Sequence, residues 1–197
     1  MPASDTCLEF VNTVGAHASQ RPFELLVDYD TLITWCQSHD VVSATQAELL
    51  IERARRQPVS AERALSRVKE LRETTFRILM AFTADTAPSR SDVATLNTQL
   101  VDAVNHLRIT PSASGFSFTW RGTPHALEQM LWPLTCGVAN LLTSPELQRL
   151  RRCEEKTCGW VFIDRSRGGT RRWCSMESCG NRSKARRHYA RQKSHAS

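Results

Sequence analysis

The chain has 197 residues, of which 41% are hydrophobic and 23% are charged, with only 8 Gly and 8 Pro. This globular composition excludes wholesale disorder and collagen-like repeats. The longest uncharged run, residues 129–145, falls short of the ~18 apolar residues that a membrane helix needs. The first ten residues include Asp5 and Glu9 and no basic start, unlike a secretory signal. We therefore expect a cytoplasmic protein that does not contact membranes.

Positive charge and cysteine are concentrated near the C-terminus. Residues 1–150 hold 13 basic and 16 acidic residues, a balance of −3, whereas residues 151–197 hold 13 and 4, a balance of +9. This asymmetry indicates a neutral or acidic body that carries a basic appendage. Four of the seven cysteines lie in the basic part. An odd cysteine count in a cytoplasmic chain favours metal binding over a disulfide framework.

The first elements alternate between strand-like and helix-like patterns. Residues 7–13 predict a short strand, because their apolar and polar side chains alternate. A helix is predicted to begin after Asp28 or Asp30, either of which can cap it. The next helix is predicted to open at Thr45, three residues before Glu48, which is the spacing of a capping box.

The pattern over residues 60–120 predicts two helices followed by a β-hairpin. Helical spacing of apolar residues predicts a long helix over about 60–84, and a second helix after a loop at 85–91. Residues 106–110 and 116–120 predict two strands joined by a short loop. All of these elements can be built into a mostly helical body.

The most apolar helix of the chain is predicted after the hairpin. Thr123 and Pro124 have the pattern of a helix start, and the helix is expected to reach Leu142 with a kink or break at Pro133. A similar start signal at 144–146 predicts a short helix that ends near residue 152.

The body carries no motif of a known catalytic site. It lacks a Gly-rich phosphate loop, a His-Glu-x-x-His motif and a Gly-x-Ser-x-Gly motif, so we expect no enzymatic activity. Asn12 and Thr13 follow the predicted first strand and are the candidate contacts for a small-molecule ligand. Hydrogen bonding to a loop backbone is the commoner role of such side chains.

Four cysteines form two close pairs. Cys153 and Cys158 are separated by four residues, as are Cys174 and Cys179, with fifteen residues between the pairs. This spacing is typical of a tetrahedral zinc site with four cysteine ligands. Buried thiols, two disulfides or an iron–sulfur cluster are alternatives. A short, highly charged segment buries too little apolar surface to fold without a cross-link such as a bound metal ion, which favours one structural Zn²⁺.

The segment around these cysteines predicts a small finger. Residues 160–164 and 170–173 are expected to form a β-hairpin around the turn at 166–169, where Gly168 and Gly169 accept positive φ. Residues 183–192 are expected to form a helix. Such a finger is treble-clef-like or ribbon-like.

The predicted fold class is therefore α+β with two domains. Residues 1–148, called the body below, form a helix-rich domain with a small β-sheet. Residues 149–197, called the finger below, form the zinc-binding domain.

The finger resembles a known family. Residues 179–182 read Cys-Gly-Asn-Arg, and 158–167 and 171–176 also resemble the CGNR zinc-finger family, so that the likeness extends over about 150–192. In that family an ABATE domain precedes the finger, and residues 8–13 and 30–35 resemble its start. The resemblance implies that the four cysteines bind zinc and that the chain is a bacterial regulator of transcription that responds to stress.

Basic residues surround the proposed zinc site and predict contact with double-stranded DNA, in the nucleoid, through phosphates and base edges. The candidate residues are Arg165, Arg167, Arg171, Arg172, Asn181, Arg182, Lys184, Arg186, Arg187 and Arg191. Two alternatives remain. The finger could be a protein-interaction module, or Trp160, Phe162 and Trp173 could stack on RNA bases, although they suit the small core of a finger better. In the DNA-binding regulator that we expect, the body senses a small molecule or forms a homodimer, and the finger binds the DNA.

Overall fold

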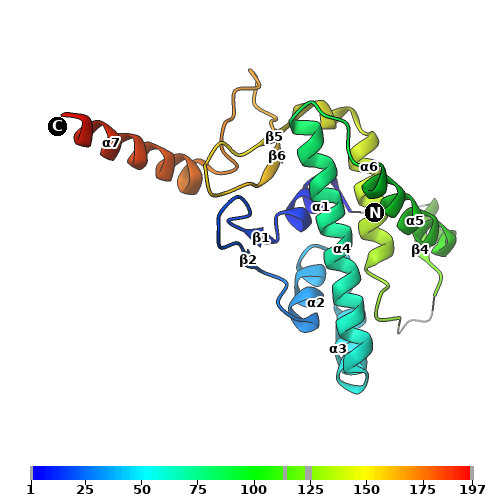
Figure 1. Cartoon of the computed structure of the whole chain (residues 1–197). Coiled ribbons are helices and arrows are strands. Elements are labelled where there is room, and N and C mark those ends of the chain that lie inside the picture. Colours follow the sequence, from blue (N-terminus) through cyan, green and yellow to red (C-terminus); the bar gives the residue numbers. More distant parts are fainter. Residues whose placement is uncertain (1, 113–114, 123–125, 196–197) are drawn as a thin grey trace.

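A helical body carries a C-terminal helix that projects from one side of the molecule (Figure 1). This computed structural model describes residues 2–112, 115–122 and 126–195. Its elements in chain order are α1 (Ser4–Val11), β1 (Val14–Gly15), β2 (Phe23–Glu24), α2 (Tyr29–Ser38), α3 (Ala44–Arg56), α4 (Pro58–Thr83), α5 (Arg90–His106), β3 (Leu107–Ser112), β4 (Gly115–Trp120), α6 (Leu131–Thr143), η1 (Pro145–Arg149), β5 (Leu150–Arg152), β6 (Val161–Ile163), η2 (Met176–Gly180) and α7 (Asn181–His195).

The 26-residue α4 is the central element of the body. Helices α1, α2, α3, α5 and α6 contact it, and so does β5. Pro58 occupies its first turn, where a missing N–H leaves no hydrogen bond unmade. Leu71 and Leu79 are fully buried on its inner face. The predicted helix over 60–84 is confirmed, with its start two residues earlier.

Helices α2 and α3 begin at polar caps. The Asp28 carboxylate accepts the Thr31 N–H at 2.7 Å, which confirms one of the two predicted caps of α2. The capping box of α3 is formed by Ser43 and Gln46. The prediction that it opens at Thr45 was therefore wrong by two residues, because Ser43 presents the same spacing with a Gln at the third position.

The predicted strand over residues 7–13 is wrong, because this segment forms α1. Cys7, Leu8, Phe10 and Val11 are buried on one side of that helix. Their spacing of one, three and four residues fits a helical turn, and a short apolar run does not distinguish the two structures.

The hairpin predicted after α5 is confirmed. Strands β3 and β4 pair antiparallel from Leu107 opposite Trp120 to Ser112 opposite Gly115. The ladder is longer than expected because Pro111 and Ser112 remain in it. Residues 113–114 lie outside the described part of the chain.

Helix α6 continues through Pro133, so the predicted interruption there is wrong. Pro133 lies in the first turn of α6, where its missing N–H has no intrahelical acceptor. The predicted helix start at Thr123 and Pro124 lies outside the described residues. The next predicted helix is the shorter 3₁₀-helix η1, and residues 150–152 are instead strand β5.

The finger hairpin has a different second strand from the predicted one. Strand β6 lies where the sequence indicated, but it pairs antiparallel with β5, which precedes the first cysteine. The prediction of a strand over 170–173 is wrong. The Asp164 carboxylate accepts the N–H groups of Ser166 and Arg171, which holds the intervening segment as a loop.

The finger strands share the main hydrophobic core with the body. Leu150, Val161 and Ile163 belong to the same buried cluster as Leu8 of α1 and Leu79 of α4. The described residues form three two-stranded sheets among helices, which confirms the helix-rich α+β class. Among the described helices, none combines the length and the apolarity needed to cross a membrane.

Candidate metal centre and basic finger

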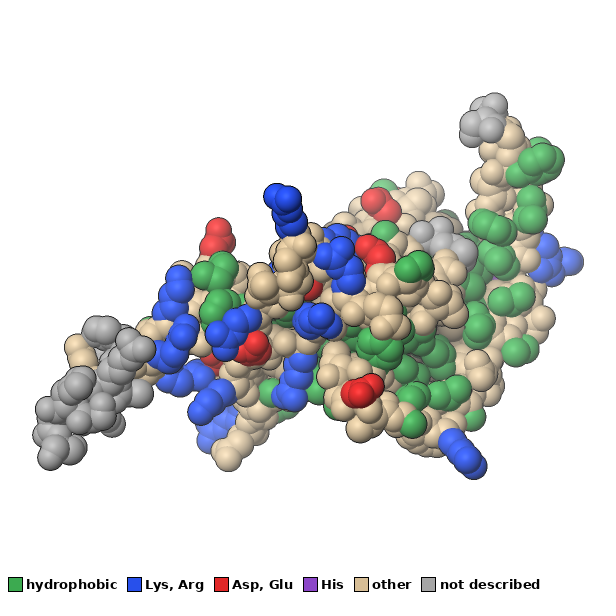
Figure 2. Space-filling view, turned by 90° about the horizontal axis from the view of Figure 1, so that it is seen from above, with side chains coloured by type: hydrophobic (Ala, Val, Ile, Leu, Met, Phe, Trp, Pro, Cys, Tyr) green, Lys and Arg blue, Asp and Glu red, His purple; other side chains and the backbone are tan. Residues whose placement is uncertain are grey.

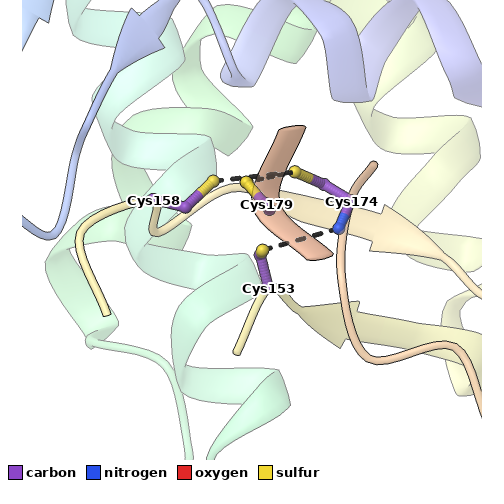
Figure 3. Close-up of side chains that lie close together, drawn as sticks. All are labelled: Cys153, Cys158, Cys174 and Cys179. Atoms are coloured by element: carbon purple, nitrogen blue, oxygen red, sulfur yellow. Dashed lines mark hydrogen bonds between the residues drawn. The ribbon is translucent and has the colours of Figure 1, made fainter. Parts of the chain in front are cut away.

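The four paired cysteines converge on one point (Figure 3). The sulfur atoms of Cys153, Cys158, Cys174 and Cys179 all lie within 4.8 Å of one another. Two of the separations, Cys158–Cys174 and Cys174–Cys179, are 3.6 and 3.5 Å. Tetrahedral zinc with Zn–S bonds of ~2.3 Å places its sulfur ligands about 3.8 Å apart. The donor set therefore fits one zinc ion, with a ligand at every position.

The local fold explains why the first two cysteines meet. Strand β5 leads directly into Cys153, whose N–H donates to the Trp160 carbonyl at 2.8 Å. The Cys158 N–H donates to the Glu155 carbonyl at 3.0 Å, which closes a tight turn. Gly159 follows with a φ of +75°, a conformation that favours glycine. The turn thus directs both side chains toward the same point.

The second pair comes from the loop after β6 and from η2. The Cys174 N–H donates to the Cys153 sulfur at 3.5 Å, as is common around zinc-bound thiolates. The buried Cys179 lies in η2, and the Ser175 hydroxyl accepts the Ser178 N–H at the start of that turn. Helix α7 begins directly after η2.

The sulfur cluster needs a cation to become fully ionised. Hydrogen bonds from the Cys158 and Cys174 thiols lower the pKa of Cys153. The same contacts raise the pKa of Cys158 and of Cys174, because a thiol that donates to a thiolate resists losing its proton. Four thiolates at this distance repel one another, and a bound Zn²⁺ offsets that repulsion.

Arginines of the finger complement the negative charge of the centre. Arg182 donates from Nη2 to the Cys179 sulfur at 3.0 Å. Arg171 donates to the carbonyls of Trp173 and Cys174, and its guanidinium lies 4.5 Å from the centre of the Phe162 ring. Both side chains therefore stabilise the finger itself.

The aromatic side chains of the finger are packed around the cysteines. Phe162 is buried beside them, with Trp160 and Trp173 partly buried against the same cluster. Trp160 also donates from Nε1 to the Val14 carbonyl of the body at 2.8 Å. These contacts confirm the prediction that the three rings form a small core.

Three of the predicted nucleic-acid contacts form ion pairs with acidic residues of the same chain. Arg165 pairs with Asp5 at 2.7 Å and with Glu146 at 2.9 Å. Arg172 donates from Nε to Glu154 at 2.7 Å, and Arg186 donates to Glu155 at 2.6 Å. The Glu155 side chain is only 1% exposed. Its pairing with Arg186 fixes α7 against the turn between the first two cysteines.

Three other predicted contacts have no partner among the described side chains. The side chains of Arg167, Lys184 and Arg187 are exposed and make no ion pair or hydrogen bond with any described residue. Asn181 donates its amide to the Glu177 carbonyl at 2.9 Å. The side chain of Arg191 lies outside the described part. In Figure 2 basic side chains gather over the finger end of the molecule.

Helix α7 divides its basic residues between two faces. Arg182 and Arg186 are four residues apart and both contact the metal centre or its turn. Lys184 and Arg187 are three residues apart and lie on the opposite side, because a helix turns 100° per residue. The two basic side chains that the structure describes on the outward face are therefore exposed rather than engaged with the metal centre.

The two candidate ligand contacts are engaged within the protein. Asn12 donates from Nδ2 to the Val161 carbonyl at 2.8 Å and accepts the Val161 N–H at 3.1 Å. Thr13 donates to the Phe10 carbonyl and accepts from Arg72, which also holds Glu24 through two bonds of 2.7 Å. Asn12 therefore joins the body to the finger.

Sequence reasoning missed Glu155 as a structural residue of the metal centre. The sequence gives only a weak indication of this role. Glu155 lies between the first two cysteines and is one of four acidic residues in a segment that holds thirteen basic ones. The role of Trp160 in docking the finger was also missed, because nothing in a sequence indicates which distant carbonyl an indole N–H reaches.

Comparison with known families gives two matches in the order that the sequence indicated. A family model described as a "putative stress-induced transcription regulator", named ABATE, matches residues 4–145. A model of the CGNR zinc finger matches residues 149–192. No curated protein gives a match.

Proposed function

Since the chain belongs to the ABATE family and ends in a CGNR zinc finger, we propose that it is a transcription regulator that binds double-stranded DNA through the finger. The observation that carries the proposal is the outward face of α7. Lys184 and Arg187 lie there without acidic partners among the residues that the structure describes, on a helix that projects from the body (Figure 1). The proposal assigns no enzymatic activity to the chain and places it in the cytoplasm, at the nucleoid.

A projecting basic helix suits the major groove of DNA. Helix α7 has 15 residues, which corresponds to about 22 Å. The B-DNA major groove is ~12 Å wide and admits a helix. Lys184, Arg187 and Arg167 would bind phosphates and release counterions, which makes such binding steeply dependent on salt.

The packing of the finger aromatics argues for duplex DNA over single-stranded RNA. Phe162 is buried, and Trp160 and Trp173 pack against the metal centre. Rings held in this way cannot stack on splayed bases. The alternative of a protein-interaction module is tested by the same experiment.

The body offers a site for a small-molecule signal. A hollow of about 370 Å³ is lined by Arg53, Arg63, Arg67, His106 and Trp132, among others. Arg67 pairs with Glu128, whereas Arg53 and Arg63 have no partner among the described residues. Asp102 and Glu128 also line the hollow, so three arginines face two carboxylates and the net charge is positive. This excess of positive charge suits a small anionic molecule with a flat ring, since the His106 and Trp132 rings stack at 3.9 Å on one wall. We propose that this hollow binds the signal.

The test is binding of zinc-quantified protein to duplex DNA over a range of salt concentrations. We expect Lys184→Ala/Arg187→Ala to weaken binding and to reduce the slope of log K against log salt by about 2, the loss of two phosphate contacts. The matched control is Arg55→Ala/Arg90→Ala, which removes the same charge from exposed positions on the body. Its slope should equal that of the wild type.

Other outcomes overturn the proposal in distinct ways. A zinc-loaded protein that fails to bind duplex DNA at low salt would make the finger a protein-interaction module. A clear preference for single-stranded RNA would make it an RNA-binding protein. The Cys174→Ser/Cys179→Ser variant, which removes two ligands, should lose both zinc and DNA binding.

A further inference from the structure

The β3–β4 hairpin has one apolar face along its whole length. The antiparallel register places residues of the same kind opposite each other: Leu107 and Trp120, Ile109 and Phe118, and Pro111 and Phe116. Since neighbouring residues of a strand point to opposite sides, the pairs between them form the other face. That second face is polar, with Arg108, Thr110, Ser112, Thr119 and Ser117.

The body covers only the base of this apolar face. Trp120 is partly buried and packs near Trp132, with ring centres 6.4 Å apart. Farther out, Ile109 is 67% exposed, Phe116 78% and Phe118 53%. A two-stranded hairpin is only marginally stable by itself in water, so an uncovered apolar face is costly.

Two further exposed apolar side chains lie on α5, which leads directly into β3. Val101 and Val104, on its last turns, are 63% and 51% exposed. In Figure 2 hydrophobic side chains line the projecting hairpin and the adjoining part of the body. We call Val101, Val104, Ile109, Phe116 and Phe118 the hairpin patch.

The hairpin patch lies in a region that is depleted of charge. The described residues between 91 and 118 include three charged ones, the buried Asp92, the partly buried Asp102 and the exposed Arg108, which donates to the carbonyls of Asn105 and Leu107. The partly exposed Asp102 lies 3.9 Å from His106. Scarcity of charge together with exposed aromatic side chains is characteristic of interface cores.

We propose that the hairpin patch is a homodimer interface, occupied by the hairpin patch of a second copy of this chain. A two-fold contact sets each residue against the same surface of its partner, which favours an uncharged patch and would repel a charged one. The five side chains would bury roughly 500 Å² of apolar surface per copy. A standard interface buries about 800 Å² per partner, and the flanking polar residues of α5 and the hairpin can supply the remainder.

The dimer deepens the proposed function but does not depend on it. One finger offers few contacts to DNA, and a dimer, which carries two fingers, would double their number. The pairing of the fingers on one duplex rests on the proposed DNA binding, whereas the dimer can be measured without any nucleic acid.

The experiment is sedimentation of the zinc-loaded full chain at 1 to 50 µM without DNA. We expect a dimer of twice 22.3 kDa for the wild type. Phe116→Thr/Phe118→Thr should raise the dissociation constant at least about 30-fold, because buried aromatic residues dominate interface affinity. The matched control exchanges the partners on the polar face, Thr110→Ser/Ser117→Thr, and should remain a dimer.

A second variant protects the test against misfolding of the hairpin. Val101→Glu leaves both strands intact and buries one carboxylate from each copy in an apolar interface without a countercharge, so it should also yield monomers. Zinc content and far-UV circular dichroism verify the fold of every variant. A monomeric wild type at 50 µM overturns the proposal, and the hairpin patch would then be a candidate binding surface for a different protein. A dimer that survives both the Phe and the Val101 variants places the interface elsewhere.

Discussion

Asn12 joins the body to the finger through one side chain. Its amide makes both hydrogen bonds that a neighbouring strand would make with Val161, at the edge of β6. Because Val161 is fully buried, water cannot replace these bonds when the amide is lost.

We therefore expect Asn12→Ala to lower the free energy of unfolding by about 2 kcal/mol, the cost of leaving a buried backbone pair unsatisfied. Chemical denaturation of the zinc-loaded protein measures this change. Gln37→Ala, at an exposed position of α2, should change stability by less than ~0.5 kcal/mol. An equal effect of the two substitutions would contradict the role assigned to Asn12.

The ion pair of Glu24 with Arg72 predicts a dependence of stability on pH. Partial burial alone would raise the pKa of Glu24, but the hydrogen bonds from Arg72 and from the Leu26 N–H, together with the Arg72 charge, hold it below its usual value. A carboxyl group with a lowered pKa stabilises the fold above its unfolded pKa of about 4.3. That contribution is lost as the pH falls through the lower folded-state pKa.

We expect Glu24→Gln to cost about 1 to 2 kcal/mol at neutral pH, because the buried Arg72 loses one of its two carboxylate partners and keeps only Glu73 among the described residues. The difference from wild type should shrink as the pH falls below about 4. Urea denaturation at pH 7, 5 and 3 measures it. Glu62→Gln, at an exposed position without a partner among the described residues, should show no such trend.

At the scale of elements, α7 carries an anchored arginine and an exposed one at consecutive positions. Arg186 points to the buried Glu155, whereas Arg187 is exposed. Substituting neighbouring arginines should therefore have different consequences.

We expect Arg186→Ala to lower stability by about 1 to 2 kcal/mol and to speed the loss of zinc to a chelator, because it leaves a buried carboxylate unpaired. Arg187→Ala should leave zinc release unchanged and lower the salt dependence of DNA binding. Zinc release is followed with a colorimetric chelator. Equal rates in the two variants would show that the Glu155 pair does not hold the centre.

The comparison of elements shows where sequence patterns carry enough information. Helices α2 and α4 and the β3–β4 hairpin were predicted because their caps, periodicity and loop residues agree. The segment that forms α1 was misassigned because a run of eight residues fits either period. The pairing of β6 with β5 was missed because tertiary packing decides which strands pair. Here both strands contribute to the shared core, whereas the nearby glycines indicated a local turn and a different partner.

The candidate site divides in the same way. Cysteine spacing was sufficient to find the metal ligands, since short turns fix their distances. Charge alone could not separate Arg165, which binds Asp5 and Glu146, from Arg167, which binds no described residue. The acidic partners are 160 and 19 residues away in the sequence, so only the fold reveals them.

At the scale of the whole molecule, the metal centre and the body should unfold together. Val161 and Ile163 follow the first two cysteines and lie in the main core. Loss of the ion would weaken their packing against Leu8 and Leu79, which lowers the stability of the body without unfolding it at room temperature.

We expect chelation of zinc to lower the melting temperature of the whole chain and to make four thiols reactive toward a disulfide reagent at pH 8. The three body cysteines should react slowly, because burial raises the pKa of Cys7 and of Cys36 to about 12 and also raises that of Cys136. Thiol titration and calorimetry measure both effects. A body transition that is the same with and without zinc would contradict the shared core.

The close contact at Gly159 has a consequence for how two copies would read a DNA site. A Cβ at this position would lie 2.9 Å from the Ala18 backbone nitrogen, so the finger rests directly on the body rather than on a flexible tether. In a dimer the two bodies would then hold the two α7 helices at one fixed distance from each other. Inserting about five base pairs between two half-sites would rotate one of them to the far side of the duplex, beyond the reach of its finger.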